Sequence, residues 1–160
     1  MKQTETVWMF RLDQSQSERI KCFLARFSVK AIKQRVYTYE TDFFYLRDHG
    51  IMLRVIDRAG ERIGELLRPC GKNHFQKETF PVFGFPYMLE IDDEVACLTD
   101  SSEIECTTIS FGENLFVQLE SNAHSPSYPP ILTLHFSSDY IQETEKLRTL
   151  LLQAISSDSL

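Results

Sequence analysis

The sequence predicts an α+β protein, mainly antiparallel β, with one helix early in the chain and one at its end. About eight segments alternate between apolar and polar residues, which is typical of strands with one buried face. Most of them follow one another in hairpin-like succession. Two other segments place apolar residues at helical spacing. Consecutive antiparallel strands of this kind favour a barrel or a strongly curved sheet.

The strands are assigned from this alternation and from the turn residues between them. The expected strands are residues 4–12, 36–40, 51–57, 62–68, 75–83, 103–111, 114–121 and 131–136. The third and fourth form a hairpin around Arg58, Ala59 and Gly60. Pro81 limits the fifth strand because proline cannot donate to a sheet. Residues 41–50 read as a loop or short helical turn, and residues 86–98 as a short helix.

The two main helices are amphipathic. In residues 13–27, Ser15 and Glu18 have the spacing of a capping box. The apolar stripe of this helix comprises Ile20, Phe23, Leu24 and Phe27. The last helix is expected to begin near Ser138 or Asp139. Its apolar face comprises Ile141, Leu147, Leu150, Leu151 and Ala154, and residues 155–160 are expected to be a frayed tail.

Length and composition restrict the classes of function. The 160 residues are enough for one domain, 1–160, with its own core. A net charge of −6 argues against a generic nucleic-acid or anionic-membrane binder. The four cysteines lack zinc-ligand spacing, and no apolar run approaches the ~20 residues of a membrane span. The expected location is therefore the cytoplasm.

Arg54 is unusual because it interrupts an apolar strand. It lies in the stretch IMLRVID, residues 51–57, where either face could be buried. A buried arginine is rare unless it is paired with an anion. Its guanidinium must therefore reach water or bind an anion.

Residues 39–69, which include this strand, carry a family pattern. The segment reads YETDFFYLRDHGIMLRVIDRAGERIGELLRP. It resembles the CYTH superfamily, also called triphosphate tunnel metalloenzymes, which includes thiamine triphosphatases, inorganic triphosphatases and some adenylate cyclases. The family pattern is Y-x-D-T, a leucine, L-R-x-R, a hairpin and L-x-x-K-x-P. The matching residues are Tyr39, Glu40, Thr41, Leu46, Leu53, Arg54, Ile56, Leu67, Arg68 and Pro69.

The resemblance extends more weakly to both ends of the chain. The family's first-strand E-x-E-x-K-F falls on Glu5, Val7, Met9 and Phe10, and its R-x-E strand falls on Gln76 and Glu78. A later acidic strand falls on Gln118 and Glu120, and the closing carboxylate pair on Thr133 and His135.

The resemblance implies a fold and a site. The implied fold is an eight-stranded antiparallel tunnel barrel, in which basic side chains grip a triphosphate and carboxylates hold Mg²⁺ or Mn²⁺. By this resemblance, the ligand-binding residues are Arg54, Arg68 and Lys77, and the metal ligands, if the protein is active, are Glu5, Glu78 and Glu120. Arg54 is expected to face Arg68 across the hairpin, with Glu5 nearby.

The departures from the pattern favour binding over catalysis. Val7, Met9 and Ile56 stand where the family has charged residues, and apolar side chains cannot ligate Mg²⁺. The leading interpretation is a catalytically degenerate barrel, a pseudoenzyme, that binds a phosphorylated or triphosphate-containing ligand or a protein partner. The alternatives are an active metal-dependent triphosphatase and an unrelated small barrel that binds an apolar ligand. Arg54 could also form a structural ion pair with Glu65 or Glu5.

Overall fold

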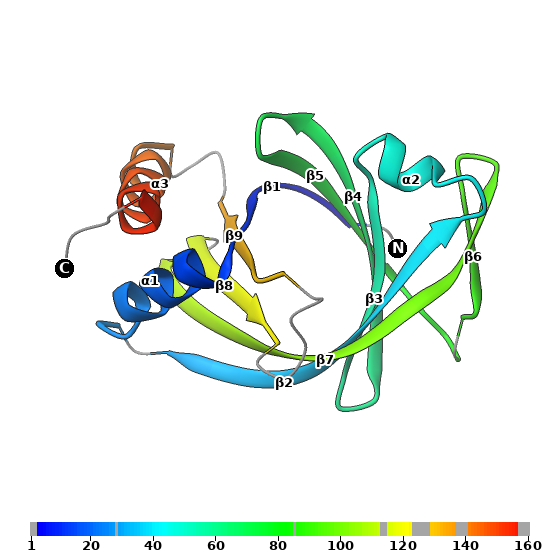
Figure 1. Cartoon of the computed structure of the whole chain (residues 1–160), viewed down its shortest axis with the longest axis horizontal. Helices are drawn as coiled ribbons and strands as arrows, with labels where there is room; N and C mark the ends of the chain where they lie inside the picture. Colours follow the sequence, from blue (N-terminus) through cyan, green and yellow to red (C-terminus); the bar gives the residue numbers. More distant parts are fainter. Residues whose placement is uncertain are drawn as a thin grey trace. The chain divides into compact units, whose positions relative to one another are not determined.

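The computed structural model describes residues 3–27, 29–84, 86–112, 115–122, 129–136 and 141–156. Most of the described chain is β-strand, and the strands are long (Figure 1). In chain order the elements are β1 (Gln3–Arg11), α1 (Gln14–Leu24), β2 (Lys30–Thr41), α2 (Tyr45–Asp48), β3 (Met52–Arg58), β4 (Glu61–Gly71), β5 (His74–Pro81), β6 (Met88–Ile91), β7 (Glu94–Gly112), β8 (Leu115–Ser121), β9 (Ile131–His135) and α3 (Ile141–Ser156).

The pairing of the strands confirms the predicted fold class. The described strands join in the order β2-β3-β4-β5-β1-β9-β8-β7-β6, and β2 also pairs with β7. This additional pairing closes β1 to β5 and β7 to β9 into a ring of eight strands, with β6 attached outside it. The pairs whose register is known are antiparallel. The topology is therefore that of an eight-stranded antiparallel barrel with one extra strand and three helices.

The chain divides into two compact units. The first unit comprises Met1–Thr6 and Lys33–Ile104, and the second comprises Val7–Ile32 and Glu105–Leu160. Each unit is described by itself below. The expectation of a single domain over 1–160 stays a prediction.

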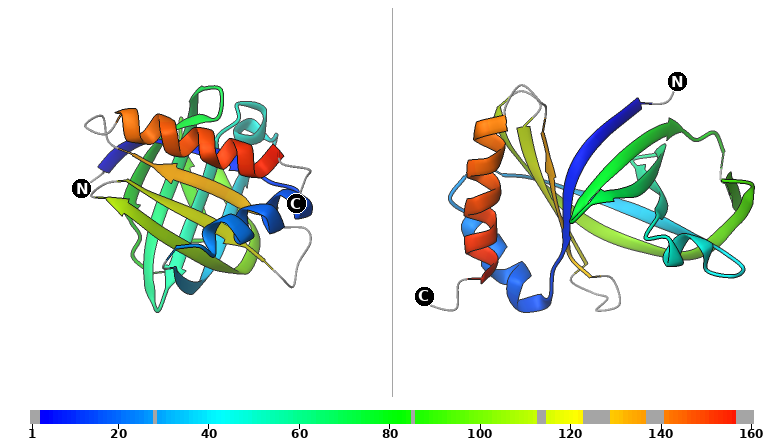
Figure 2. Two further views of the ribbon diagram at one scale, coloured as in Figure 1. Left: turned by 90° about the vertical axis from the view of Figure 1, so that its left-hand side faces the viewer. Right: turned by 90° about the horizontal axis from the view of Figure 1, so that it is seen from above.

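In the second unit, two helices cover one face of the sheet. Figure 2 shows α1 and α3 lying across β8 and β9. A buried apolar cluster joins these elements, and the Arg19 side chain of α1 donates to the Ile155 carbonyl of α3 at 2.9 Å. The cluster comprises Trp8, Leu12, Ile20, Leu24, Ile109, Leu115, Val117, Leu119, Leu132, Leu134, Leu147, Leu151 and Ile155.

The helix ends differ from the sequence prediction. The capping box of α1 is formed by Asp13 and Gln16, which replaces the predicted pair Ser15 and Glu18. Asp13 is extended and directly precedes the first helical residue, the position from which a side chain can reach the free backbone N–H groups. At the other end, Ile155 is helical and buried, so the expected frayed tail does not include it. Residues 137–140 and 157–160, where the start of the last helix and the rest of the tail were predicted, lie outside the described residues.

In the first unit, the predicted β3–β4 hairpin is confirmed. Arg58 pairs with Glu61, and the turn residues Ala59 and Gly60 both have positive φ, 56° and 89°. Two such residues match the twist of the flanking strands. The Asp57 carboxylate accepts a hydrogen bond from the Gly60 N–H at 3.0 Å and supports the turn. The predicted short helical turn within residues 41–50 is α2, and β5 ends at Pro81 as predicted.

The short helix predicted for residues 86–98 is wrong, because this segment is the β6–β7 hairpin. Ile91 pairs with Glu94 across Asp92 and Asp93, which have φ values of 51° and 63°. Aspartate tolerates this left-handed conformation better than most residues. Leu89, Ile91, Ala96 and Leu98 belong to the apolar cluster of the first unit. Their spacing of two within each strand is a strand pattern.

Candidate ligand-binding site

The charged residues of the first unit are divided between the two faces of the β3–β4–β5 sheet. Residues paired across antiparallel strands point to the same face, and neighbours along a strand point to opposite faces. The paired residues Arg54 and Glu65 therefore share a face with Lys77, which pairs with Leu67. We call this the Arg54 face. The opposite face, which we call the Arg68 face, comprises Leu66, Arg68, Gln76, Glu78 and Phe80.

The expectation that Arg54 faces Arg68 across the hairpin is therefore wrong. The two residues lie on adjacent strands, as predicted, but their side chains point to opposite faces. Arg54 pairs with Glu65, and Arg68 lies three residues after Glu65 on the same strand. An odd separation along a strand changes the face.

The Arg54 face holds a network of ion pairs centred on the buried residues Arg54 and Glu65. The Arg54 Nε donates to Glu65 Oε1 at 2.8 Å, and both residues are buried, at 4% and 6% exposure. The Lys77 Nζ lies 3.2 Å from Glu65 Oε2 and 3.6 Å from Glu5 Oε1. Two cations thus contact two carboxylates. The Arg54 guanidinium, which had to reach water or bind an anion, therefore binds the Glu65 carboxylate.

The protonation of Glu65 depends on this network. Burial by itself would raise the pKa of the Glu65 carboxyl, because a charged group loses its hydration. The Arg54 guanidinium and the Lys77 ammonium outweigh burial and lower the pKa of Glu65 from 4.5 to about 2. Glu65 is therefore ionised at neutral pH and compensates the buried arginine.

The Arg68 face carries a more exposed ion pair. Two guanidinium nitrogens of Arg68 donate to the two carboxylate oxygens of Asp92, each at 2.8 Å. The Tyr45 hydroxyl donates to the same carboxylate at 3.0 Å. The side chains of Arg68 and Asp92 are 39% and 32% exposed. The hydrogen bonds with Arg68 lower the pKa of the Asp92 carboxyl and raise that of the guanidinium.

Two cavities adjoin Arg68. One of 390 Å³ is lined by Thr4, Leu66, Arg68, Gln76 and Glu78. The other, of 320 Å³, shares Leu66, Arg68 and Glu78 with the first and is otherwise lined by Leu53, Phe80, Leu89, Glu90, Ile91 and Asp92. The first is therefore mostly polar, and the second has apolar walls with carboxylates. Volumes of this size suit small organic ligands.

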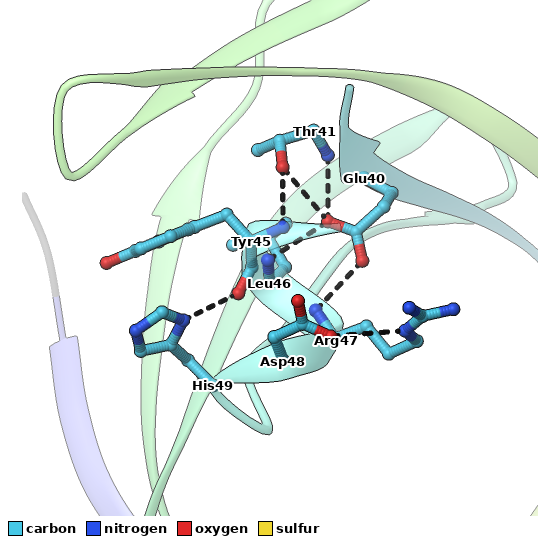
Figure 3. A network of polar contacts seen from close by, with 7 residues as sticks. All are labelled: Glu40, Thr41, Tyr45, Leu46, Arg47, Asp48 and His49. Atoms are coloured by element: carbon cyan, nitrogen blue, oxygen red, sulfur yellow. Dashed lines mark hydrogen bonds and ion pairs between the residues drawn. The ribbon is translucent and has the colours of Figure 1, made fainter. Parts of the chain in front are cut away.

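The glutamate of the Tyr39–Glu40–Thr41 motif has a structural role in shaping this face (Figure 3). The Glu40 carboxylate accepts hydrogen bonds from the backbone N–H groups of Thr41, Leu46 and Arg47 at 2.8, 3.0 and 2.8 Å. The Thr41 hydroxyl accepts one from the Tyr45 N–H at 2.8 Å. These bonds satisfy N–H groups at the start of α2. They hold the short helix that carries Tyr45 toward Asp92.

The carboxylates predicted as metal ligands do not form a metal site within the first unit. Glu5 contacts Lys77 on the Arg54 face, whereas Glu78 lies on the Arg68 face. Glu120 belongs to the second unit, where it is buried. Among the residues that the structure describes, no group of three or more histidine, cysteine, aspartate or glutamate residues could hold a metal ion. A metal cofactor, Mg²⁺ or Mn²⁺, stays a prediction.

In the second unit, Thr133 and His135 occupy the strand where the family pattern has its closing carboxylate pair. They pair with Met9 and Val7 of β1, and all four residues are buried. His135 Nε2 lies 2.8 Å from the amide oxygen of Gln118. The resemblance implies that these positions depart from the family's carboxylate pair, and the structure has polar and apolar side chains packed together there.

Three solved structures allow the fold to be compared with known proteins. A proposed adenylate cyclase from Bacillus halodurans has a TM-score of 0.63 at 14% identity, over 99% of this chain and 94% of that one. A second from Vibrio parahaemolyticus has a TM-score of 0.59 at 9% identity, over 96% and 90%. The chain has the CYTH-type fold. A proposed adenylyl cyclase from Hippeastrum, described by its dominant triphosphatase activity, has a TM-score of 0.56 at 12% identity, over 94% and 87%.

The same fold confirms the barrel architecture that the resemblance implied. It removes the alternative of a small barrel unrelated to the CYTH fold. No protein-family model and no curated protein sequence matches the chain. No helix in the described part of the chain is long and apolar enough to cross a membrane.

Sequence reasoning missed one residue beside Arg68, namely Asp92, which lines the second cavity. The sequence pattern places Asp92 in a short helix and does not predict its bidentate contact with Arg68. The left-handed Asp92–Asp93 pair between two alternating apolar runs is a hairpin signal that could have indicated it. Glu65 was foreseen as a possible partner of Arg54, and this ion pair is confirmed.

Proposed function

We propose that the first unit binds a phosphorylated small molecule at Arg68 and does not hydrolyse it. The observation that carries this proposal is the polar cavity beside Arg68. Its lining combines the Arg68 guanidinium with the hydroxyl of Thr4, the amide of Gln76 and the carboxylate of Glu78. Arginine recognises phosphate oxygens with two parallel hydrogen bonds, and neutral donors complete such a site.

The Arg68–Asp92 pair supports exchange with a ligand. The guanidinium already binds two carboxylate oxygens, a geometry close to that required for a phosphate. Exposed ion pairs contribute little to stability, so an incoming anion displaces Asp92 at small cost. Asp92 then serves as an internal substitute for the ligand's oxygens.

The Arg54 face is less suited to this role, although Arg54 and Lys77 were both predicted as ligand-binding residues. Arg54 is buried and paired, and Lys77 contacts Glu65 and Glu5. A phosphate would have to displace carboxylates from buried cations, which leaves charges without compensation. Their part in ligand binding stays a prediction, with Arg68 as the primary contact.

Binding without hydrolysis follows from the arrangement of charges. Phosphoryl transfer is accelerated mainly by positioned cations that neutralise the developing charge, often metal ions. Glu5 and Glu78, two of the predicted metal ligands, lie on opposite faces of the sheet, and Arg54 and Lys77 both contact carboxylates. We therefore favour a binding protein over a metal-dependent triphosphatase. Separately, the cysteine spacing and the lack of a long apolar run favour the cytoplasm as its location.

Isothermal titration calorimetry with tripolyphosphate tests the proposal directly. The wild type and Arg35→Gln should bind, since Arg35 is a half-exposed arginine paired elsewhere with Glu103. Arg68→Gln should lose at least about tenfold in affinity, because a charge-assisted bidentate contact contributes more than 1.4 kcal/mol. Equal binding by Arg68→Gln and the wild type would contradict the proposed site.

Phosphate release from tripolyphosphate, thiamine triphosphate and nucleoside triphosphates, with Mg²⁺ and Mn²⁺, tests the absence of hydrolysis. No release above background is expected from any pair. Metal-dependent release that Glu5→Gln or Glu78→Gln abolishes would establish the alternative, an active triphosphatase.

A further inference from the structure

The strand β6 presents an open sheet edge. In the described sheet, eight strands close into a ring through the β2–β7 pairing, and β6 is attached by its pairing with β7 (Figure 1). An open edge is a template on which another strand can add. Both β6 and the part of β7 that pairs with it belong to the first unit.

The register determines which backbone groups of β6 face outward. Leu98 N donates to the Tyr87 carbonyl at 3.0 Å, and Leu89 and Ile91 pair with Ala96 and Glu94. Residues bonded to the neighbouring strand alternate with residues whose N–H and C=O point away from it. Since Tyr87, Leu89 and Ile91 are the residues directed toward β7, the backbone groups of Met88 and Glu90 are directed to the open edge.

The side chains of β6 hold this edge in place and leave part of it uncovered. Ile91 is buried, and both Leu89 and Ile91 pack in the apolar cluster of the first unit. Tyr87, which directly precedes the strand on the same side as Leu89, is 70% exposed, and Met88 on the opposite side is 65% exposed. A rigid edge loses little conformational entropy when a second strand adds to it.

The charge around this edge is negative. Glu90, Asp93 and Glu94 are exposed on the hairpin, and Arg68 compensates the fourth acidic residue, Asp92. A second copy of this chain would bring a second set of these carboxylates to the same edge. Charge complementarity therefore favours a basic partner over self-association.

We infer that β6 is a docking strand for an extended segment of a partner protein in which basic and apolar residues alternate. The segment adds antiparallel or parallel to β6 and pairs with the backbone of Met88 and Glu90. Its basic side chains lie on the face of β6 that carries Met88 and Glu90, and its apolar side chains lie on the opposite face, beside Tyr87 and Leu89. The phosphate site is proposed in the cavity lined by Thr4 and Gln76, whereas Glu90 lines the second cavity beside Arg68.

The test uses the full chain and a short capped peptide in which lysine alternates with valine, with fluorescence anisotropy as the readout. The wild type should bind this peptide and should bind a glutamate–valine peptide at least about tenfold more weakly. Glu90→Pro should abolish binding, because proline removes the outward N–H while the bonds of Leu89 and Ile91 to β7 remain. Glu105→Lys, an exposed position elsewhere on β7, is the control for charge and should bind as the wild type does.

Circular dichroism shows whether Glu90→Pro is folded. Glu90→Lys is a second variant, which retains the backbone N–H of residue 90. Glu90→Lys should weaken binding and leave the fold unchanged. The inference is overturned if neither peptide binds, if the two peptides bind equally, or if folded Glu90→Pro binds like the wild type. Sedimentation that shows a dimer broken by Glu90→Lys or Glu90→Pro would also overturn it and assign the edge to self-association.

Discussion

The two faces of the β3–β4–β5 sheet hold arginine–carboxylate pairs in contrasting surroundings. Arg54 and Glu65 are almost fully buried, and Lys77 contacts both Glu65 and Glu5. Arg68 and Asp92 make two good hydrogen bonds but are both about one-third exposed. The same chemical pair is therefore buried on one face, and on the other face it is exposed to water, where we propose that it exchanges with a ligand.

The difference has a simple physical origin. A buried charge that loses its partner keeps the desolvation cost without compensation, so it cannot give up that partner to a ligand. A pair in contact with water has hydration to replace the lost contact, so exchange costs little. Predictions about the two pairs should consequently differ in size, and the largest concerns Glu65.

Glu65→Gln should destabilise the protein by about 3–5 kcal/mol, because it removes the carboxylate charge that the buried Arg54 guanidinium and the Lys77 ammonium both contact. The measurement is the free energy of unfolding in urea, with Glu61→Gln, an exposed position on the same strand, as the control. Combining Glu65→Leu with Arg54→Met removes both buried charges and should recover part of the loss. A cost below about 1 kcal/mol for Glu65→Gln would show that the network is not structural.

The family resemblance and the alternation of apolar and polar residues predicted the barrel correctly. They did not determine which face of the β3–β4–β5 sheet carries each charged residue. The β3–β4 hairpin could be read from Ala59 and Gly60, because turn chemistry is local. The opposite orientation of Glu65 and Arg68 could also have been read, since three residues separate them on one strand. This opposite orientation was missed because each residue was matched to a position in the family pattern and its face of the sheet was not considered.

Other features of the site could not be predicted from the sequence. Asp92 lies 24 positions after Arg68, and their contact depends on where the β6–β7 hairpin packs. The depth at which Arg54 is buried depends on neighbouring strands, which a local pattern does not specify. The division of the chain into two compact units likewise has no signal in composition, because three long strands run through both.

The pH dependence of stability should separate the two faces further. The pKa of Glu65 falls from 4.5 to about 2 on folding, so its stabilising contribution is complete above pH 4.5. It is lost as the pH falls toward 2, and the whole difference corresponds to roughly 3 kcal/mol. Urea unfolding of the wild type and Glu65→Gln across this range should give curves that converge at low pH. Curves that stay parallel would contradict the lowered pKa.

Asp92→Asn should have the smallest effect on stability, and it tests the exchange proposed for Arg68. Its free energy of unfolding should change by less than about 1 kcal/mol, because the pair is exposed and water replaces the lost contact. The same substitution removes the carboxylate that competes for the guanidinium, so the affinity for tripolyphosphate should rise. Calorimetric titration measures this, with Asp57→Asn, which removes the carboxylate paired with Arg62, as the control. Weaker binding by Asp92→Asn would mean that the carboxylate positions Arg68 for the ligand rather than substituting for it.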